Sequence, residues 1–293
     1  MSSVPEPGLA ATAVLREVRV ELLTITPIKG TGLHHPDVVE LRETGAVGDR
    51  EFFVIDESDK LLSLTRTGAF ASLRAEVGQE LVLREGEEEV CRGPVRQGQP
   101  VWADFYGFKF VRGRIVDGPW TGLLSERAGQ PVRLVQADAP GGGIDIGPVT
   151  VLGSASVERL AAQAGEPVDP RRFRMLIGLS TDEPHVEDTW RGRRLVGEQI
   201  ELRIGDPVAR CATVTRHPDR GERDQQLVRL IKGYRGMCDL PRGPGVPFGV
   251  YAHVLRPGRL AAGELLKLMD APAQLDSIWP SDPHPIRRSH HVR

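Results

Sequence analysis

The sequence contains few cysteines and no long apolar run. Its three cysteines, in 293 residues, are far apart and form no Cys-x-x-Cys pair, so neither a disulfide framework nor a zinc knuckle is indicated. No apolar run reaches the roughly 18 residues that a membrane-spanning helix needs. No basic segment precedes the short apolar patch near the start, as a secretory signal would require. We therefore expect a cytoplasmic protein with reduced thiols and no membrane span.

An excess of positive charge is also missing. The 38 lysines and arginines are balanced by 40 acidic residues, whereas nucleic-acid-binding domains carry a basic patch or stripe. We therefore do not expect nucleic acid as a partner. The glycine-rich stretch at 141–147 precedes a strand-like run instead of following one and opening a helix, so we interpret it as a turn or linker.

Short strand-like runs dominate the sequence between its two ends. Each is bounded by glycine, proline, aspartate or serine, which are residues typical of turns. The runs are 18–28, 50–57, 60–66, 80–85, 108–116, 131–136, 174–180, 199–205, 209–215 and 250–255. The second and third runs are predicted to pair as a hairpin with a loop at 57–60. Residues 1–17 and 270–293 have no apolar period to pack, so we expect a flexible arm and a flexible tail there.

Helical periodicity occurs in only a few places. The clearest helix is predicted at 224–234, where apolar residues follow the i, i+3, i+4, i+7 spacing. A second is predicted at 154–165, with Ser154 or Ser156 as its cap and Gly165 as its end, and a short third at 121–129. Many strands and few helices predict a β-rich α+β fold built on a β-barrel with helices at its periphery. Glycine and proline concentrate at 137–148, where we expect a domain boundary.

Cys211 is the first candidate for chemistry. It lies in a strand-like run directly after Arg210, and a lone cysteine in a strand can equally be a small buried packing residue. A functional role would need an exposed thiolate stabilised by a cation or a metal. In a strand, Arg210 would point to the opposite face, so it could act on the thiol only at a bend or a strand end. Cys91 and Cys238 are interpreted as incidental.

Lys29 and Arg66 are basic residues at predicted strand ends beside glycines. A side chain in this position can reach into a pocket, and glycine lets backbone N–H groups approach an anion. The alternative is that both residues only keep the surface soluble.

Two further polar groups are interpreted structurally. His217 and Asp219 belong to a Pro-Asp-x-Gly sequence that is typical of a turn. Glu187 and Asp188 are adjacent, so in a strand they would point to opposite faces and form no carboxylate dyad. We interpret their segment as a loop anchored by a buried Trp190.

Taken together, these segments resemble the MOSC family, whose members are related to the C-terminal part of molybdenum cofactor sulfurase and to the mitochondrial amidoxime reducing component. The likeness covers about Val18 to Leu268. It rests on ITPIKGTG, GAVGDREFFVID, KLLSLTR and GQPVRLV in the first half of the chain, and on GPVTVLGSASVERL, RRFRMLIGL, VEDTWRG, VARCATVTRHPDRG and PFGVYAHVLRPGRLAAGEL in the second half.

The resemblance implies two domains and a cofactor. It implies an N-terminal β-barrel domain at 18–138 and a MOSC domain at 145–269. It also implies molybdenum cofactor (molybdopterin), with Cys211 as the catalytic residue and the protein's ligand to the metal, since a thiolate is a soft ligand. The residues implied to contact the pterin or its phosphate are Lys29, Arg66, Arg174 and Arg210.

The chain departs from the family pattern at several of these contacts. Where related reductases tend to show Phe-Arg-Pro-Asn, the chain has Met and Leu at 175–176. Gly30, Ile146, Gly147 and Ala209 also replace polar residues that the family uses. Each lost hydrogen bond could cost about 1 kcal/mol of cofactor binding.

Three functions are therefore open. The first is an oxidoreductase that reduces N-hydroxylated or N-oxide small molecules with electrons from separate electron-transfer proteins. The second is a sulfur carrier, in which Cys211 receives a persulfide from a cysteine desulfurase. The third is a barrel that performs another small-molecule reaction without molybdenum, because a fold can survive a change of site.

Overall fold

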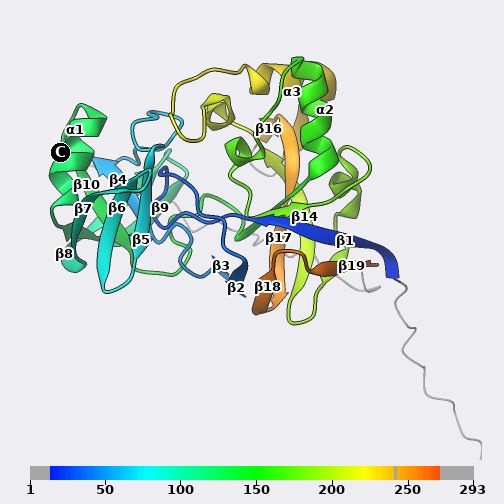
Figure 1. Ribbon diagram of the computed structural model, residues 1–293, viewed down its shortest axis with the longest axis horizontal. Coiled ribbons are helices and arrows are strands. Elements are labelled where there is room, and N and C mark those ends of the chain that lie inside the picture. Colours follow the sequence, from blue (N-terminus) through cyan, green and yellow to red (C-terminus); the bar gives the residue numbers. More distant parts are fainter. Residues whose placement is uncertain (1–13, 241–242, 271–293) are drawn as a thin grey trace, which may run out of the picture.

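The computed structural model describes residues 14–240 and 243–270. The predicted tail lies outside the described residues from 271 onward, as does the predicted arm up to residue 13. Residues 14–17, which we expected in the arm, already belong to the first strand. The chain forms two parts side by side, one around helix α1 (Trp120–Ala128) and one around helices α2 (Ser154–Ala164) and α3 (Leu227–Arg235) (Figure 1).

The part that contains α2 and α3 is built on a closed barrel, as the strand-rich sequence predicts. Its strands, in order around the barrel, are β1 (Val14–Leu23), β12 (Ile177–Leu179), β11 (Val149–Gly153), β17 (Pro247–Arg256), β14 (Glu201–Ala209), β13 (Arg194–Val196) and β19 (Leu265–Met269). β1 closes the barrel because it pairs with β12 on one side and with β19 on the other, both antiparallel.

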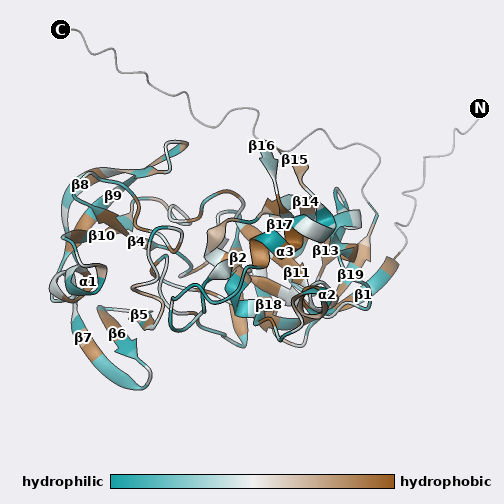
Figure 2. Cartoon of the chain, turned by 90° about the horizontal axis from the view of Figure 1, so that it is seen from above, coloured by the Kyte–Doolittle hydropathy of each residue, from teal (hydrophilic) through white to brown (hydrophobic). Residues whose placement is uncertain are grey.

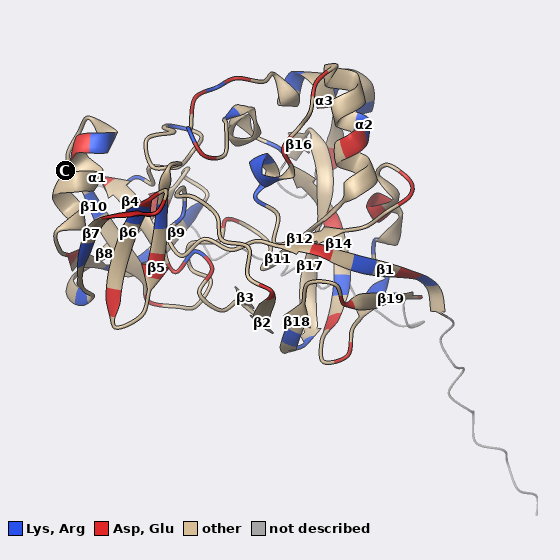
Figure 3. Ribbon diagram, viewed as in Figure 1, with Lys and Arg blue, Asp and Glu red and all other residues tan. Residues whose placement is uncertain are grey.

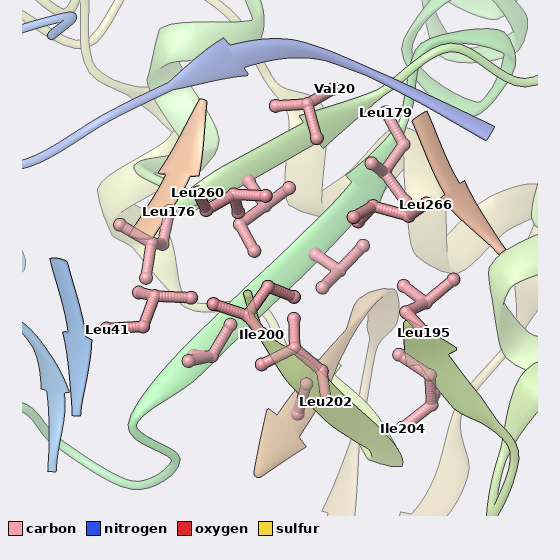
Figure 4. Packing of buried hydrophobic residues seen from close by; sticks show 14 of the residues in the cluster. Val20, Leu41, Leu176, Leu179, Leu195, Ile200, Leu202, Ile204, Leu260 and Leu266 are labelled. Carbon is pink, nitrogen blue, oxygen red and sulfur yellow. The ribbon is translucent and has the colours of Figure 1, made fainter. Parts of the chain in front are cut away.

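Side chains that alternate along these strands fill the barrel. In β14, Leu202 and Ile204 point inward and are almost completely buried, whereas the residues between them are partly exposed. Val20, Leu195 and Leu266 meet them from other strands (Figure 4). Burial of each such side chain contributes about 1.5–3 kcal/mol, so the interior of the barrel is a packed core.

Helices α2 and α3 pack together on the barrel through Val157, Leu160, Leu227 and Ile231. All three predicted helices are confirmed. The remaining helical elements among the described residues are the 3-10 turns η1 (Pro170–Phe173), η2 (Val186–Trp190) and η3 (Ala212–Thr215).

The predicted serine cap of α2 is wrong, although Gly165 ends the helix in a left-handed conformation as expected. Gly153 is the N-cap residue and has no side chain to cap the helix, and the Ala155 backbone N–H donates to the distant Thr181 hydroxyl at 3.2 Å instead. The Ser154 hydroxyl instead accepts a hydrogen bond from the Thr181 backbone N–H at 3.2 Å, and Ser156 donates to Glu187 at 2.8 Å. Both hydroxyls therefore tie the helix to the segment around η2.

The part that contains α1 has two sheets, and residues 60–62 bridge the two edge strands of the larger one. One has the strand order β4 (Phe52–Asp56), β10 (Val132–Ala137), β9 (Lys109–Asp117) and β8 (Arg96–Phe105), and the other joins β5 (Leu73–Val77), β6 (Glu80–Glu85) and β7 (Glu88–Pro94). Trp120 and Leu124 of α1 pack on both. The view from above shows this part beside the barrel, and acidic and basic residues are interspersed over both (Figures 2 and 3).

Strand pairing crosses the predicted boundary between 138 and 145. β1 belongs to the barrel of the second half, and β2 (Val38–Arg42) pairs with β3 (Gly45–Ala46) and with β18 (Gly258–Ala261). The small hairpin of β15 (Cys238–Leu240) and β16 (Gly243–Gly245) completes the described strands. The domain ranges 18–138 and 145–269 remain predictions.

Two predicted strands are shorter than expected. The hairpin at 50–66 forms its turn, but its second arm pairs with β4 only near Leu61, and the chain then leaves the sheet. The run at 209–215 is not one strand, because β14 ends at Ala209 and η3 follows. Cys211 therefore lies just beyond the end of a strand.

Candidate functional site

A cavity of about 380 Å³ lies where segments from the two halves of the chain meet. The first half contributes Lys29, Thr65 and Tyr106 to its wall, and the second half contributes Arg174 and Cys211. Its size falls within the range of about 300–1,000 Å³ that is typical of small-molecule sites.

Cys211 is not a buried packing residue, because its side chain is exposed at the cavity wall. Its sulfur lies 3.3 Å from the Thr213 hydroxyl oxygen and 3.6 Å from that of Thr65. Burial alone would raise the pKa of the Cys211 thiol, but hydrogen bonds with Thr213 and Thr65 and the charge of Arg210 together lower it below its usual value. The site thus favours a thiolate, which is the form that binds metals and attacks electrophiles.

Three of the four predicted pterin contacts line this cavity: Lys29, Arg174 and Arg210. The Lys29 ammonium forms an ion pair with Asp145 at 2.9 Å. Burial lowers the pKa of Lys29, and the nearby Asp145 carboxylate opposes this effect.

Arg174 and Arg210 are held by carbonyl groups and form no ion pair with a carboxylate in the described part of the chain. Arg174 donates to the Thr31 carbonyl at 2.7 Å, and Arg210 donates to the Phe173 carbonyl at 2.7 Å and to the Met175 sulfur at 3.3 Å. Burial, with the charge of Arg50 as the next contribution, lowers the pKa of Arg174 to about 9. Burial also lowers the pKa of Arg210. An anion in the cavity would stabilise both charges.

Arg66 is placed differently. Its guanidinium forms an ion pair with Asp56 at 2.8 Å and donates to the Leu61 carbonyl at 3.1 Å. Arg66 is not part of the described cavity wall. The turn after β4 brings Asp56 within its reach, which the sequence pattern did not indicate.

Arg50 is a cavity residue that sequence reasoning missed. It forms an ion pair with Asp49 and donates to the Arg174 carbonyl at 3.0 Å. The sequence signal that could have revealed it is GDRE at 48–51. In the structure, the backbones of Gly48 and Arg50 in this segment are left-handed, with φ of 80° and 53°. With Arg50 included, four basic side chains and two carboxylates line the cavity. This excess of positive charge favours an anionic ligand group such as a phosphate.

The residues at which the chain departs from the family pattern all lie at this cavity. They are Gly30, Ile146, Gly147, Met175, Leu176 and Ala209. Part of the wall is therefore apolar or offers only backbone groups. A ligand with a phosphate and a soft metal centre fits the cations and the thiol, and water or backbone groups would have to satisfy its other polar atoms.

The loop that carries Thr65 is fastened to the segment after Cys211. Arg216 donates from Nε to the Leu64 carbonyl at 2.5 Å. Beyond it, Gly68 and Gly221 are in backbone contact, and a Cβ atom at Gly68 would lie 2.0 Å from the Gly221 carbonyl oxygen. The two halves of the chain thereby fix Thr65 beside Cys211.

Tyr106 and Phe108 are also cavity residues that sequence reasoning missed. They lie in the tight turn between β8 and β9, where the Phe108 N–H donates to the Phe105 carbonyl. Tyr106 has a left-handed backbone with φ of 60°, which costs about 1–2 kcal/mol for a residue other than glycine. Burial and the Asp145 carboxylate raise the pKa of Tyr106 to about 12, while hydrogen bonds with Ser63 and Thr65 act in the opposite direction.

The other polar candidates lie elsewhere and have structural contacts. His217 accepts hydrogen bonds from the backbone N–H of Asp219 and Arg220, which confirms the predicted turn. Trp190 is buried in the barrel core, as predicted. Glu187 is buried beside the start of α2, and burial raises its pKa. Asp188 forms an ion pair with Arg235 on α3 instead of pairing with Glu187.

Cys91 and Cys238 are both half-buried, and burial raises the pKa of each thiol. In the described ranges, no three His, Cys, Asp or Glu side chains are grouped so that they could hold a metal ion. Helices long and apolar enough to cross a membrane are also absent from these ranges.

Comparisons with known proteins agree with the resemblance noted in the sequence. The MOSC domain family matches residues 141–267. The chain is 31% identical over 130 residues to mitochondrial amidoxime-reducing component 1 of Mus musculus, a match that covers 43% of this chain and 37% of that protein. It is 24% identical over 266 residues to molybdenum cofactor sulfurase of Caenorhabditis elegans, which covers 82% of this chain and 34% of that protein.

The chain thus spans less than two-fifths of the length of either curated relative. Among solved structures, that of the YuaD protein from Bacillus subtilis aligns over 88% of this chain and 98% of its own, with 12% identity and a TM-score of 0.41.

Proposed function

We propose, from the match of residues 141–267 to the MOSC domain family, that the chain is an oxidoreductase that binds molybdenum cofactor. Its substrates would be small N-hydroxylated molecules or N-oxides. In the reaction the N–O bond breaks, two electrons and two protons are taken up, and the oxygen leaves as water. A separate electron-transfer protein would supply the electrons.

The observation that carries this proposal is the combination of an exposed thiol with unpaired cations in one cavity. Cys211 offers a soft sulfur ligand. Arg174 and Arg210, which have no carboxylate partner among the described residues, would bind the phosphate of the pterin. When bound, the cofactor would supply the redox and oxo-transfer chemistry.

The remaining polar residues would position these groups. The Cys211 thiol donates to the Thr213 hydroxyl and also contacts the Thr65 hydroxyl, and both contacts hold it at the cavity wall. The Lys29–Asp145 ion pair contributes a polar patch to the same wall. Because Arg50 donates to the backbone of Arg174, it would orient that guanidinium toward the cavity.

The first test is the content of molybdenum and releasable pterin per chain, on protein produced in a host that makes the cofactor. We expect near-stoichiometric amounts of both. In a Cys211→Ser variant we expect at least a tenfold loss of bound molybdenum, with an unchanged circular dichroism spectrum. Cys91→Ser is the matched control and should retain the metal. Well-folded wild-type protein without molybdenum or pterin would contradict the proposal.

A second function is favoured by one specific observation, the apolar part of the cavity wall at the positions where related reductases are polar. If these positions prevent pterin binding, Cys211 could still act as a sulfur carrier. Its thiolate would attack the persulfide of a cysteine desulfurase, form a new S–S bond and release the desulfurase thiolate. Sulfur loading measured by mass spectrometry should then occur on wild-type protein and disappear in Cys211→Ser.

A further inference from the structure

We propose that a second pocket, on the outer face of the barrel beside α2, binds a small ligand with an aliphatic body and a cationic head, such as an alkylammonium ion. The pocket has a volume of about 230 Å³. Cys211 does not belong to its wall, and the inference goes beyond the proposed function because it requires no cofactor. The wall residues on which the argument depends are Glu21, Leu22, Leu152, Val157, Glu158 and Gly178.

A glycine in the middle of a strand creates this pocket. Gly178 of β12 is paired with Leu22 of β1 on one side and with Leu152 of β11 on the other. Its neighbours Ile177 and Leu179 belong to the barrel core, so Gly178 faces outward. A row of leucine, glycine and leucine therefore crosses three strands, with no side chain at its centre. Glycine inside a strand often marks a place where a ligand comes close to the backbone.

A β-bulge in β1 turns a carboxylate toward the same pocket. The pairing of β1 with β12 shifts its register between Val20 and Leu22. Val20 and Leu23 both belong to the barrel core, so the two residues between them face outward. Glu21 is exposed, Leu22 is half-buried, and both belong to the pocket wall. Bulges next to functional sites often re-aim a side chain in this way.

The charges at the mouth of the second pocket are complementary to a cation. Glu21 and Glu158 are both exposed there, and neither forms an ion pair within residues 14–240 and 243–270. Arg171 also belongs to the wall, but it is already paired with Asp169 at 2.7 Å and with Asp219 at 2.8 Å. The two glutamates therefore remain for a positively charged ligand group.

The start of α2, which borders the pocket, does not favour an anion instead. The backbone N–H of Gly153 donates to the Glu187 carboxyl group at 3.3 Å, and that of Ala155 donates to the Thr181 hydroxyl at 3.2 Å. Backbone N–H groups at a helix start are what an anion would need. Because the protein itself occupies these two, the charge preference of the pocket is set by its glutamates.

Met175 separates the second pocket from the cavity around Cys211. It belongs to the walls of both, and its sulfur accepts a hydrogen bond from Arg210 at 3.3 Å. The four basic side chains of that cavity would repel a cation. The two sites therefore take ligand groups of opposite charge.

The test is an NMR titration of the full chain, labelled at the methyl groups of leucine, valine and methionine. A volume of about 230 Å³ equals that of about seven or eight water molecules, so hexylammonium is a probe of matching size. The methyl signals of Leu22, Leu152, Val157 and Met175 should shift and saturate together. Butylammonium should bind about tenfold more weakly, because two fewer methylenes are buried. Hexanol and hexanoate should also bind more weakly, and salt should reduce the difference between hexylammonium and hexanol.

Three variants separate the charge from the shape of the pocket. Glu21→Gln and Glu158→Gln should each weaken hexylammonium binding by about two- to fivefold and leave hexanol binding unchanged. Glu17→Gln is the matched control, since Glu17 is exposed on the same strand but does not belong to the wall. Gly178→Val should fill the pocket and weaken the binding of both probes at least tenfold. A Cβ atom at Gly178 would lie 3.3 Å from that of Leu22, so a shift of a few tenths of an ångström accommodates it.

The absence of saturable shifts at these methyl groups in the wild-type chain would overturn the second pocket as a binding site. Hexanoate binding as tight as that of hexylammonium, or the same loss in Glu17→Gln as in Glu21→Gln, would overturn its preference for cations. If Gly178→Val does not fold, the glutamine variants still decide the outcome. A chain that lacks molybdenum but binds hexylammonium in this way would contradict the proposed function and support the second pocket.

Discussion

The contact between Gly68 and Gly221 leads to a quantitative prediction. A Cβ atom added at Gly68 would lie 2.0 Å from the Gly221 carbonyl oxygen and 2.5 Å from its carbonyl carbon, whereas ordinary contacts between carbon atoms are about 3.5–4.0 Å. One loop would have to move by more than about 1 Å. Overpacking of this kind costs about 1–3 kcal/mol. Gly68 has no left-handed backbone, so the expected effect of Gly68→Ala is purely steric.

The assay is urea unfolding followed by circular dichroism. Gly68→Ala should lower the midpoint without changing the slope, because the surface exposed on unfolding stays the same. In thermal unfolding of the same variant, the midpoint temperature should fall by about 2–4 °C for each kcal/mol of stability lost. Gly122→Ala is the matched control, since Gly122 lies within α1 with no atom within 4 Å of an added Cβ. It should stabilise the chain by about 0.5–1 kcal/mol. Equal stability of Gly68→Ala and wild type would refute the close approach of the two loops.

Two further predictions concern stability. Leu202→Ala removes a fully buried side chain from the barrel and should cost about 2–5 kcal/mol in urea unfolding; a loss below 1 kcal/mol would contradict a packed interior. Hydrogen bonds from Arg127 and Ser72 lower the pKa of Glu85 to about 2 from its usual 4.5. Its stabilising contribution is therefore present above pH 4.5 and is lost as the pH falls toward 2. Glu85→Gln should make the midpoint temperature fall less steeply over that window, and an unchanged pH profile would argue against the pair.

Much of the fold follows from local sequence patterns. The apolar spacing at 224–234 predicts α3, because residues at this spacing form one face of a helix. Leu227 and Ile231 belong to that face and are buried in the core. The many short runs predict a β-rich barrel for the same reason, since alternating residues such as Leu202 and Ile204 must face a core.

The local geometry of the site could not be predicted in this way. The residues from Ala209 to Thr215 favour a strand by composition, yet the chain turns at Cys211 because the Thr215 hydroxyl donates to the Ala212 carbonyl and Thr213 contacts Thr65. The second contact joins residues 148 positions apart. No pattern within a single segment reports it.

The charged residues show the same limit. Arg50 lies at the cavity because two left-handed residues turn the backbone there, and Arg66 lies outside it because Asp56 binds it. In the sequence, Arg50 and Arg66 both lie close to residues that are typical of turns. Only the three-dimensional path of the chain distinguishes them.

The pairing of β1 with β19 affects how the protein can be synthesised. Val18 is paired with Leu266, so during synthesis β1 has no partner on that side until β19, which follows much later in the chain, emerges from the ribosome. During translation the open edge of β1 exposes unpaired N–H and C=O groups, which can pair with other chains. Contacts this distant in sequence also slow folding. Barrel closure is therefore expected to be a late step in folding that depends on protection of the nascent strand β1.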